Sequence, residues 1–352
     1  MKARLCAVGT SVPPTRYTQE EVLRELRVSD ERISSMFRGG AINSRHLVLP
    51  PIGADGRRTQ ESQGELLAKH RKWSVKLAAE ALDKCLADLG CSPAAVDFLC
   101  CVTSTGFMTP GVTARLLQHA GMRPDCSRLD VVGMGCNAGL NGLAPVAAWA
   151  EANPGKLAVM VCVEVCSAAY VFDGTMRTAV VNSLFGDGAA AVAVSTSSER
   201  QFGLPQPEII KTSSHIILDQ IEAMRYDWDE GYGLFSFYLD SQIPYVIGAH
   251  AEIALTRLLA GTGLGVNDIS HWLVHSGGKK VIDAFRVNLG LSRHDVRHTL
   301  SVLRDHGNLS SGSFLFSLER LQRESCGSPG DYGVMATMGP GSTIEMALIQ
   351  WT

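Results

Sequence analysis

Apolar and polar positions along the chain form two kinds of block that alternate. Short runs that are apolar throughout, such as residues 98–102 and 157–163, are typical of strands buried on both faces. Longer stretches such as residues 81–90 and 254–263 have apolar positions at helical spacing and close with glycine, as helices commonly do. The alternation of strand and helix predicts an α/β fold in which helices cover both faces of the sheets.

The same order of segments occurs twice. Four segments of the first half have counterparts at nearly constant separation in the second half: 81–90 with 254–263, 98–102 with 272–275, 137–139 with 310–312, and 157–163 with 332–337. This repeat predicts two related halves, residues 1–200 and 201–352, whose sheets pack around central helices in five layers (αβαβα). Residues 201–248 interrupt the repeat with aromatic and charged side chains. We interpret them as an insertion that shapes a pocket or as a partner surface.

The composition argues against nucleic-acid binding, metal binding, secretion and a membrane-spanning segment. The 352 residues are 45% hydrophobic and 19% charged with a net charge of −3, which gives no reason to expect nucleic-acid binding. The ten cysteines are scattered without a CxxC pair or metal-ligand spacing, so neither disulfides nor a metal is expected. No secretory signal pattern and no apolar run long enough to span a membrane is recognised. A cytoplasmic location is therefore predicted.

One cysteine stands where an apolar run gives way to a predicted helix. Cys136 lies in the segment 131–142 with glycines on both sides, which leaves room for a substrate. Unpaired N–H groups and the positive end of the helix dipole favour the thiolate there, and the thiolate is the form that attacks carbonyls. The segment alone leaves two interpretations open, a catalytic nucleophile or a buried cysteine in a tight turn.

A histidine and an asparagine occupy glycine-rich settings in the second half. His275 ends a buried strand, and Asn308 precedes an apolar helix. Taken singly, the first is more simply a core histidine and the second a turn residue or helix cap. If the two halves are related by pseudo-symmetry, however, their turns face each other, and both side chains converge on Cys136.

Five motifs, in order, carry a resemblance to a known family: GCNAG at 135–139, LFGDGA at 184–189, HSGG at 275–278, GNLSS at 307–311 and MGPGS at 338–342. With these motifs the chain resembles the type III polyketide synthases of the thiolase superfamily. The resemblance implies a thiolase-like fold, a homodimer, CoA thioester substrates and no metal or redox cofactor. It also implies that Cys136 carries the acyl chain, that a His275 imidazolium lowers the pKa of this thiol, and that His275 and Asn308 stabilise an enolate.

Within the family, segments 133–141, 166–170 and 173–183 resemble a bacterial subfamily that condenses malonyl-CoA to 3,5-dihydroxyphenylacetyl-CoA in glycopeptide antibiotic biosynthesis. The resemblance extends to pathway partners of the enoyl-CoA hydratase type. A tetrahydroxynaphthalene or resorcinol product remains open, as does a priming ketosynthase or acyltransferase. An inactive paralogue that serves as a binding subunit is the alternative from a different class.

Pocket residues follow from the same resemblance. Phe237 corresponds to a gatekeeper aromatic, Ser104 and Cys166 to cavity-lining positions, and Gly277 and Gly278 to the turn beside the histidine. A second gatekeeper position falls near residues 207–208, where no aromatic is found, and Thr109 replaces a methionine that reaches the partner subunit in many members. Candidate cations for the CoA phosphates are Arg32, Arg38 and Arg45, with Lys279 and Lys280 as alternatives.

Overall fold

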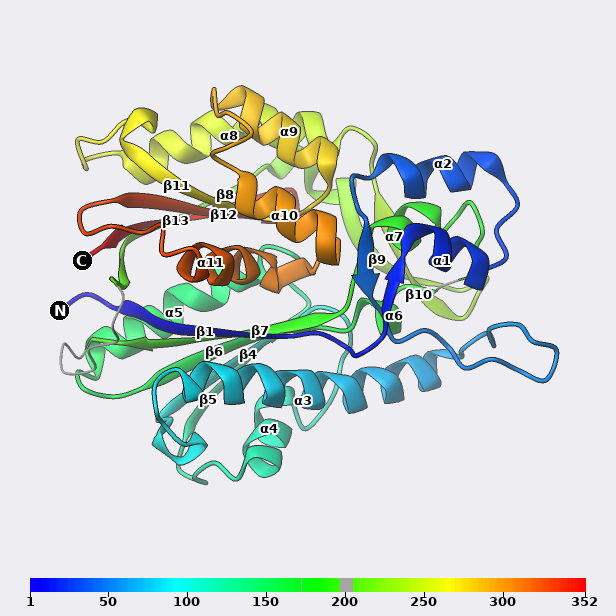
Figure 1. Ribbon diagram of the computed structural model, residues 1–352, viewed down its shortest axis with the longest axis horizontal. Coiled ribbons are helices and arrows are strands. Elements are labelled where there is room, and N and C mark those ends of the chain that lie inside the picture. Colours follow the sequence, from blue (N-terminus) through cyan, green and yellow to red (C-terminus); the bar gives the residue numbers. More distant parts are fainter. Residues whose placement is uncertain (172, 197–204) are drawn as a thin grey trace.

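The computed structural model describes residues 1–171, 173–196 and 205–352. Its main feature is a nine-stranded sheet in the order β11-β12-β13-β8-β1-β7-β6-β4-β5 (Figure 1). The strands are β1 (Arg4–Ser11), β4 (Phe98–Thr103), β5 (Ser127–Val132), β6 (Ala158–Glu164), β7 (Gly188–Ser195), β8 (Pro207–Ile216), β11 (Ile269–Val274), β12 (Tyr332–Gly339) and β13 (Thr343–Trp351).

The sheet consists of two halves with the same connectivity. Outward from the β1–β8 junction, the first half runs β7, β6, β4 and the second runs β13, β12, β11, with two antiparallel pairings followed by a parallel one in each. The halves pair at Arg4 and Glu208, whose side chains also form a 2.7 Å ion pair. The segments that repeat in the sequence therefore lie on equivalent strands. The predicted boundary at 200/201 lies outside the described residues and stays a prediction.

Helices form the other three layers, as Figure 1 shows. The central layer contains α5 (Ala138–Ala152) and α11 (Ser313–Arg323), which contact strands of both halves. The outer layers contain α3 (Gln63–Ala87) with α4 (Val112–Ala120) on the first half, and α8 (Ile243–Leu259) with α9 (Lys279–Asn288) on the second. Because β6 and β12 are covered on both faces, almost every residue in them is buried, and this confirms the five-layered αβαβα prediction.

The remaining elements are short helices, 3-10 turns and two small strand pairs. The helices are α1 (Gln19–Glu25), α2 (Glu31–Gly39), α6 (Cys166–Ala169), α7 (Ala179–Leu184) and α10 (Arg297–His306), with 3-10 turns η1 (Pro93–Ala95), η2 (Leu218–Ala223), η3 (Val266–Asp268) and η4 (Ser310–Gly312). Two small antiparallel pairs are β2 (Arg16–Thr18) with β3 (Ser44–His46), and β9 (Met224–Asp229) with β10 (Leu234–Leu239). None of the helices within the described residues is long and apolar enough to cross a membrane.

The structure corrects the extent of the predicted insertion at 201–248. Strand β8 belongs to the repeat, since it occupies in the second half the place of β1 in the first. The beginning of α8, at Ile243, belongs to the repeat as well, because α8 covers its sheet as α3 covers the other. What interrupts the repeat is the region of η2 and the β9–β10 hairpin, which lies beside the N-terminal helices (Figure 1).

Candidate active site

The turn that carries Cys136 connects β5 to α5, and its thiol lies two residues before the helix begins. Gly135 has φ +83°, and a Cβ there would lie 2.2 Å from Cδ of Pro340. A Cβ at Gly339 would lie 2.3 Å from Oδ1 of Asn137. The Gly-Pro-Gly loop between β12 and β13 therefore packs directly on the cysteine turn, and this close approach explains why glycine is needed on both sides.

His275 follows β11, and its ring is held by a serine from the start of α11. Its Nδ1 lies 2.6 Å from Oγ of Ser313. That hydroxyl donates its hydrogen to the carbonyl of Ser310 (3.2 Å) and accepts the N–H of Ser276 (3.3 Å). With the hydroxyl hydrogen directed to Ser310 in this way, Nδ1 donates to Oγ of Ser313, and Nε2 of the neutral ring is left as an acceptor; the reverse direction at Nδ1 would exchange these roles. A Cβ at Gly277 would lie 3.1 Å from Nε2, so glycine there leaves this nitrogen uncrowded.

Asn308 is fixed through both its backbone and its side chain. Its N–H donates to the carbonyl of Leu184 (2.9 Å), and its carbonyl accepts the N–H of Gly186 (3.0 Å). Its Oδ1 accepts the N–H of Ser310 at 2.8 Å. Since Oδ1 is engaged by the backbone, the amide NH₂ is the group left to donate to a substrate.

The three side chains line one small cavity of about 40 Å³. Its lining is otherwise almost entirely apolar: Cys136, Leu184, Phe185, Met224, Phe237, Leu239, Ile243, His275, Gly277, Val281, Asn308 and Met338. The predicted convergence of residues from both halves is therefore observed. An apolar lining around a thiol, an imidazole and an amide is suited to chemistry from which water is excluded.

Burial shifts the pKa values of Cys136 and His275 in opposite directions. It raises the pKa of the Cys136 thiol to about 12, although the hydroxyl of Ser310, 3.5 Å from Sγ, lowers it in part. Burial also lowers the pKa of His275 to about 3. The sequence-based expectation of an imidazolium that activates the thiol is therefore not met in this structure, because removal from water disfavours both charged forms. The geometry instead suits a neutral imidazole that accepts the thiol proton during attack.

A buried carboxylate beneath the site was not anticipated. Glu164 ends β6, is fully buried, and accepts the N–H of Ser104 (2.9 Å) and the hydroxyls of Ser311 and Ser310. Burial raises its pKa to about 6, which the hydroxyl of Ser311 partly counteracts. Its position in the sequence, the one acidic residue ending an apolar strand of the first half, was the signal that could have identified it.

Comparison with known proteins identifies the family of this chain. Residues 55–206 match the model for FAE1/type III polyketide synthase-like proteins, and residues 213–351 match that for the C-terminal domain of chalcone and stilbene synthases. The 3,5-dihydroxyphenylacetyl-CoA synthase of Amycolatopsis orientalis is 60% identical over 348 residues, 99% of this chain and 93% of that protein. The chain belongs to the type III polyketide synthase family.

One further sequence relative and one solved structure are also similar to this polyketide synthase. The 1,3,6,8-tetrahydroxynaphthalene synthase of Streptomyces peucetius subsp. caesius is 33% identical, with 99% of this chain and 93% of that protein covered. The crystal structure of PKS-I from the brown alga Ectocarpus siliculosus superposes with a TM-score of 0.92 at 24% identity, covering 100% of this chain and 98% of that one. The thiolase-like fold expected from the sequence is thereby confirmed.

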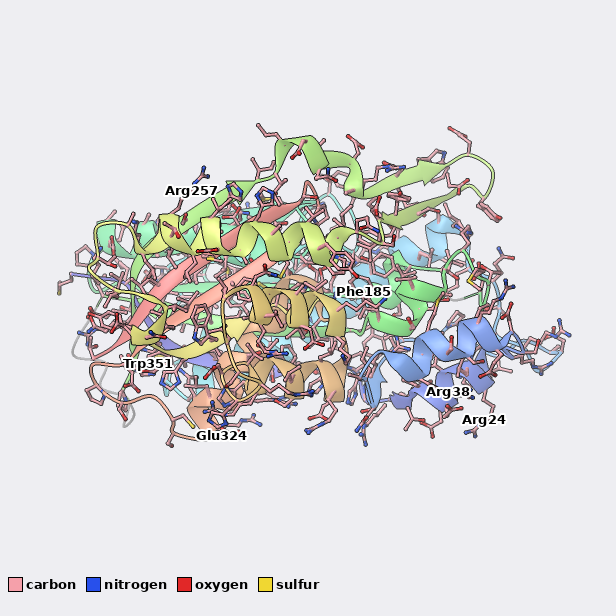
Figure 2. The ribbon with its side chains drawn as sticks, turned by 90° about the horizontal axis from the view of Figure 1, so that it is seen from above. Arg24, Arg38, Phe185, Arg257, Glu324 and Trp351 are labelled. Atoms are coloured by element: carbon pink, nitrogen blue, oxygen red, sulfur yellow. The ribbon has the colours of Figure 1, made fainter. Side chains whose placement is uncertain are left out.

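Two phenylalanines face each other in the cavity of the synthase. Phe237 comes from β10, and its ring lies 5.9 Å from that of Phe185, edge to face. Phe185 belongs to the LFGDGA motif and is labelled in Figure 2. Residues 207–208, where a second gatekeeper position was expected, pair with β1 and β13 in the main sheet and do not line this cavity. Phe185 could have been found from its motif.

Other predicted pocket residues lie behind the cavity. Oγ of Ser104 accepts the N–H of Gly135 at 2.8 Å and so supports the cysteine turn from below. Cys166 is fully buried in a cluster with Cys136 and Tyr170. Neither is among the residues that line the cavity with Cys136. Gly278 has φ +128°, a backbone conformation that favours glycine, and a Cβ there would lie 3.4 Å from Cδ1 of Leu184.

The arginine predictions divide into two groups. Arg45 is fully buried and donates to the carbonyl of Phe185 at 2.7 Å, so a role in binding CoA phosphates at the surface is wrong. Arg32 and Arg38 are exposed on α2, as Figure 2 shows for Arg38, but each is paired with carboxylates: Arg32 with Asp30, and Arg38 with Glu20 and Glu31. Their role toward CoA stays a prediction, as does that of Lys279, which pairs with Asp283.

Proposed function

We propose that this polyketide synthase condenses malonyl-CoA units iteratively and cyclises the chain to 3,5-dihydroxyphenylacetyl-CoA. The convergence of Cys136, His275 and Asn308 on one apolar cavity carries the proposal of decarboxylative condensation. The identity of 60% to the Amycolatopsis orientalis enzyme over nearly the whole chain supports the product. The metal-free reaction expected from the sequence stays part of the proposal.

Loading begins with the neutral thiol of Cys136. Its sulfur attacks the malonyl thioester carbonyl while its proton passes to Nε2 of His275, whose Nδ1–H is held by Ser313. The tetrahedral intermediate then expels CoA, which takes the proton from the imidazolium and leaves as the thiol. The acyl group remains on sulfur, and the imidazole is neutral again.

Extension uses the donors of the second half. A second malonyl-CoA places its thioester oxygen against the NH₂ of Asn308, and loss of carbon dioxide leaves an enolate whose charge this donor stabilises. The nucleophilic carbon attacks the acyl group on Cys136, and the thiolate leaves as the chain is transferred to CoA. Four malonyl-CoA molecules then give one eight-carbon aromatic acyl-CoA, three CoA, four carbon dioxide and one water.

The proposal includes a homodimer. Strand β5 is the outer strand of its half of the sheet and carries exposed residues, among them Val132. Phe107 and Met134 on the adjoining loops are also exposed, at 71% and 40%. An open strand edge flanked by apolar side chains fits a second copy of the same chain. Exchanging Val132 for Asp should shift the mass measured by light scattering from dimer to monomer.

Isotope-labelled malonyl-CoA, supplied alone, tests the proposed activity. We expect an eight-carbon aromatic product, released as its CoA thioester, with carbon dioxide and free CoA in the ratio given above. A ten-carbon naphthalene product would favour the reaction named for the Streptomyces peucetius relative. Consumption of malonyl-CoA only when another acyl-CoA is added would refute self-priming. Conversion of the released thioester by an enoyl-CoA hydratase-type enzyme remains a prediction about the pathway.

A further inference from the structure

A second cavity lies beside the first and shares one wall with it. It has a volume of about 30 Å³ and is lined by Tyr170, Val171, Arg177, Thr178, Val181, Phe235, Ser236 and Phe237. Phe237 lines both cavities, and Tyr170 and Val181 belong to the same buried cluster as Cys136. Phe237 is therefore the shared wall that a chain growing from Cys136 would have to displace to reach the second cavity.

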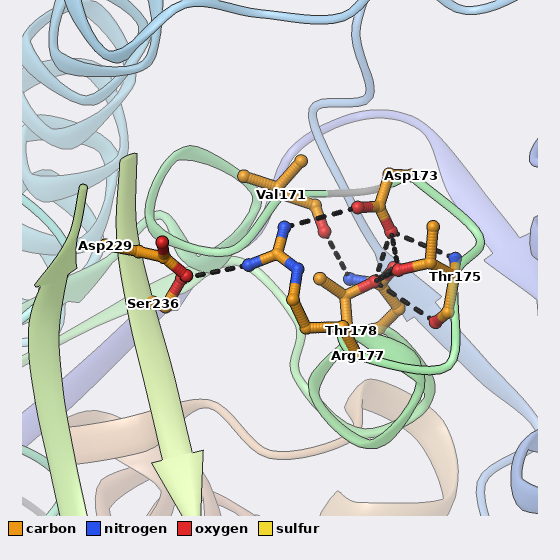
Figure 3. Close-up of polar contacts among 8 residues, drawn as sticks. Val171, Asp173, Thr175, Arg177, Thr178, Asp229 and Ser236 are labelled. Atoms are coloured by element: carbon orange, nitrogen blue, oxygen red, sulfur yellow. Dashed lines mark hydrogen bonds and ion pairs between the residues drawn. The ribbon is translucent and has the colours of Figure 1, made fainter. Parts of the chain in front are cut away.

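Arg177 is the one permanently charged side chain among the described residues that line the two cavities. Figure 3 shows its guanidinium between β10 and the loop before α7. Its Nη1 donates to Oγ of Ser236 at 2.9 Å, its Nη2 reaches Oδ2 of Asp173 at 3.4 Å, and its Cζ lies 3.9 Å from the centre of the Tyr232 ring. The guanidinium is thus held in place by contacts from two separate segments.

These contacts leave the guanidinium with capacity to bind an anion. It has five N–H groups, of which two are used here, and Nε has no acceptor among the described residues. The bond to Asp173 is long, whereas Oδ1 of the same carboxylate is engaged by the N–H of Thr175 (3.0 Å) and by the hydroxyls of Thr175 and Thr178. Asp173 is therefore anchored by its own loop and does not saturate the arginine.

We propose that Arg177 recognises the carboxylate that a malonyl starter leaves at the end of the growing chain. The proposal rests on the self-priming condensation proposed above. Among the aromatic and aliphatic walls of the two cavities, a guanidinium binds a carboxylate through charge and through a two-pronged hydrogen bond, which a neutral acyl end cannot provide. The residue would thus select a dicarboxylic starter over an acetyl or longer alkyl one.

The same hairpin offers a matched control. Arg225 lies 4.2 Å from the ring of Tyr238 and pairs with Asp227, much as Arg177 lies over Tyr232 and pairs with Asp173. Arg225 is not among the residues that line either cavity. Comparing variants of Arg177 and Arg225 therefore separates the effect of a cation that lines the cavity from the effect of a cation that only stacks on the hairpin.

The test supplies malonyl-CoA together with isotope-labelled acetyl-CoA and measures the ratio of malonyl-primed to acetyl-primed products by mass spectrometry. We expect Arg177→Met to lower this ratio at least 30-fold, and Arg225→Met to change it less than twofold. Arg177→Lys keeps the positive charge but lacks the two parallel N–H groups of the guanidinium, so its ratio should lie between those of the two methionine variants. Ser236→Ala removes one contact that holds the guanidinium but keeps its charge, so its ratio should fall less than that of Arg177→Met.

The outcomes that overturn the proposal are separate from those that overturn the activity. Equal loss of both products in Arg177→Met, with the same loss in Ser236→Ala, would mean that Arg177 only holds the hairpin. An unchanged ratio in Arg177→Met would remove its role altogether. If Arg177→Met does not fold, the ratios of Arg177→Lys and Ser236→Ala decide. A wild-type enzyme that makes no product from malonyl-CoA alone would instead refute the proposed function, and this inference with it.

Discussion

Two turns meet at the candidate active site, one from each half of the duplicated fold, and they differ in chemistry. The turn before α5 carries the thiol of Cys136, whereas the turn before α11 follows Asn308 and carries the hydroxyl of Ser310, with that of Ser313 at the start of the helix. Both occupy the same place relative to their sheets. Duplication thus supplied two helix starts that face each other, and in the proposed mechanism one half provides the nucleophile and the other the hydrogen-bond donors.

The two turns also differ in how tightly they are packed. A Cβ at Gly139 would lie 2.2 Å from the carbonyl of Ser311, in the opposite turn. A Cβ at Gly312, the equivalent glycine of the second half, would meet nothing closer than Cβ of Cys162 at 3.4 Å. The contact between the halves therefore requires glycine at position 139. At position 312, a Cβ would make only ordinary van der Waals contacts.

The largest expected effect comes from removing the thiol itself. Cys136→Ala should lower condensation more than about 1,000-fold and leave the fold intact, because the acyl carrier is lost while little volume changes. Mass spectrometry of the wild type after exposure to malonyl-CoA should find the adduct on the peptide that contains Cys136. Cys326→Ser, in the loop that follows α11, serves as the control and should keep full activity. An adduct found only on another cysteine would contradict the assignment.

The next largest effect should come from removing the hydrogen-bond donor of the second half, Asn308. Asn308→Ala is expected to slow decarboxylation of malonyl-CoA on the order of 100-fold to 1,000-fold, since a donor to the enolate is removed. Loading of Cys136 should change much less, because the amide does not contact the thiol proton in the proposed mechanism. Release of labelled carbon dioxide and formation of the acyl-enzyme measure the two steps separately. Equal loss of both would mean that Asn308 acts structurally.

The packing difference can be tested with the two equivalent glycines. Gly139→Ala should lower the free energy of unfolding by about 1–3 kcal/mol and reduce activity, because the new Cβ forces the facing turns apart. Gly312→Ala should change it by less than about 1 kcal/mol, since its Cβ would make an ordinary contact. Denaturant unfolding of both variants measures the difference. Similar costs at the two sites would show that the turns are packed alike.

The smallest effect concerns pH. Because burial raises the pKa of Glu164 from 4.5 to about 6, the folded protein binds this proton more tightly than the unfolded chain. The resulting stability is present below pH 4.5, is lost as the pH rises through 6, and amounts to about 2 kcal/mol. Relative to the wild type, Glu164→Gln should therefore gain about this much in unfolding free energy between pH 4.5 and pH 7. A difference that does not vary with pH would mean that folding leaves the pKa of Glu164 unchanged.

The sequence determined much of the architecture. Fully apolar runs predicted strands buried on both faces, and the repeat predicted that segments such as 98–102 and 272–275 occupy equivalent strands, as β4 and β11 do. The motifs identified Cys136, His275 and Asn308 as the candidates that share a cavity. These predictions succeeded because periodicity reports which faces are buried, and because a duplicated fold brings equivalent turns together.

Tertiary structure alone decided the charges and the distant contacts. Nothing local to Arg45 distinguishes it from an exposed arginine, yet packing against the 184–186 loop buries it completely. The neutral state of His275 follows from its removal from water, and the place of Arg177 beside Phe237 follows from the β9–β10 hairpin folding back onto the first half. Desolvation and long-range packing depend on every element that covers a residue, so no pattern of neighbours along the chain could reveal them.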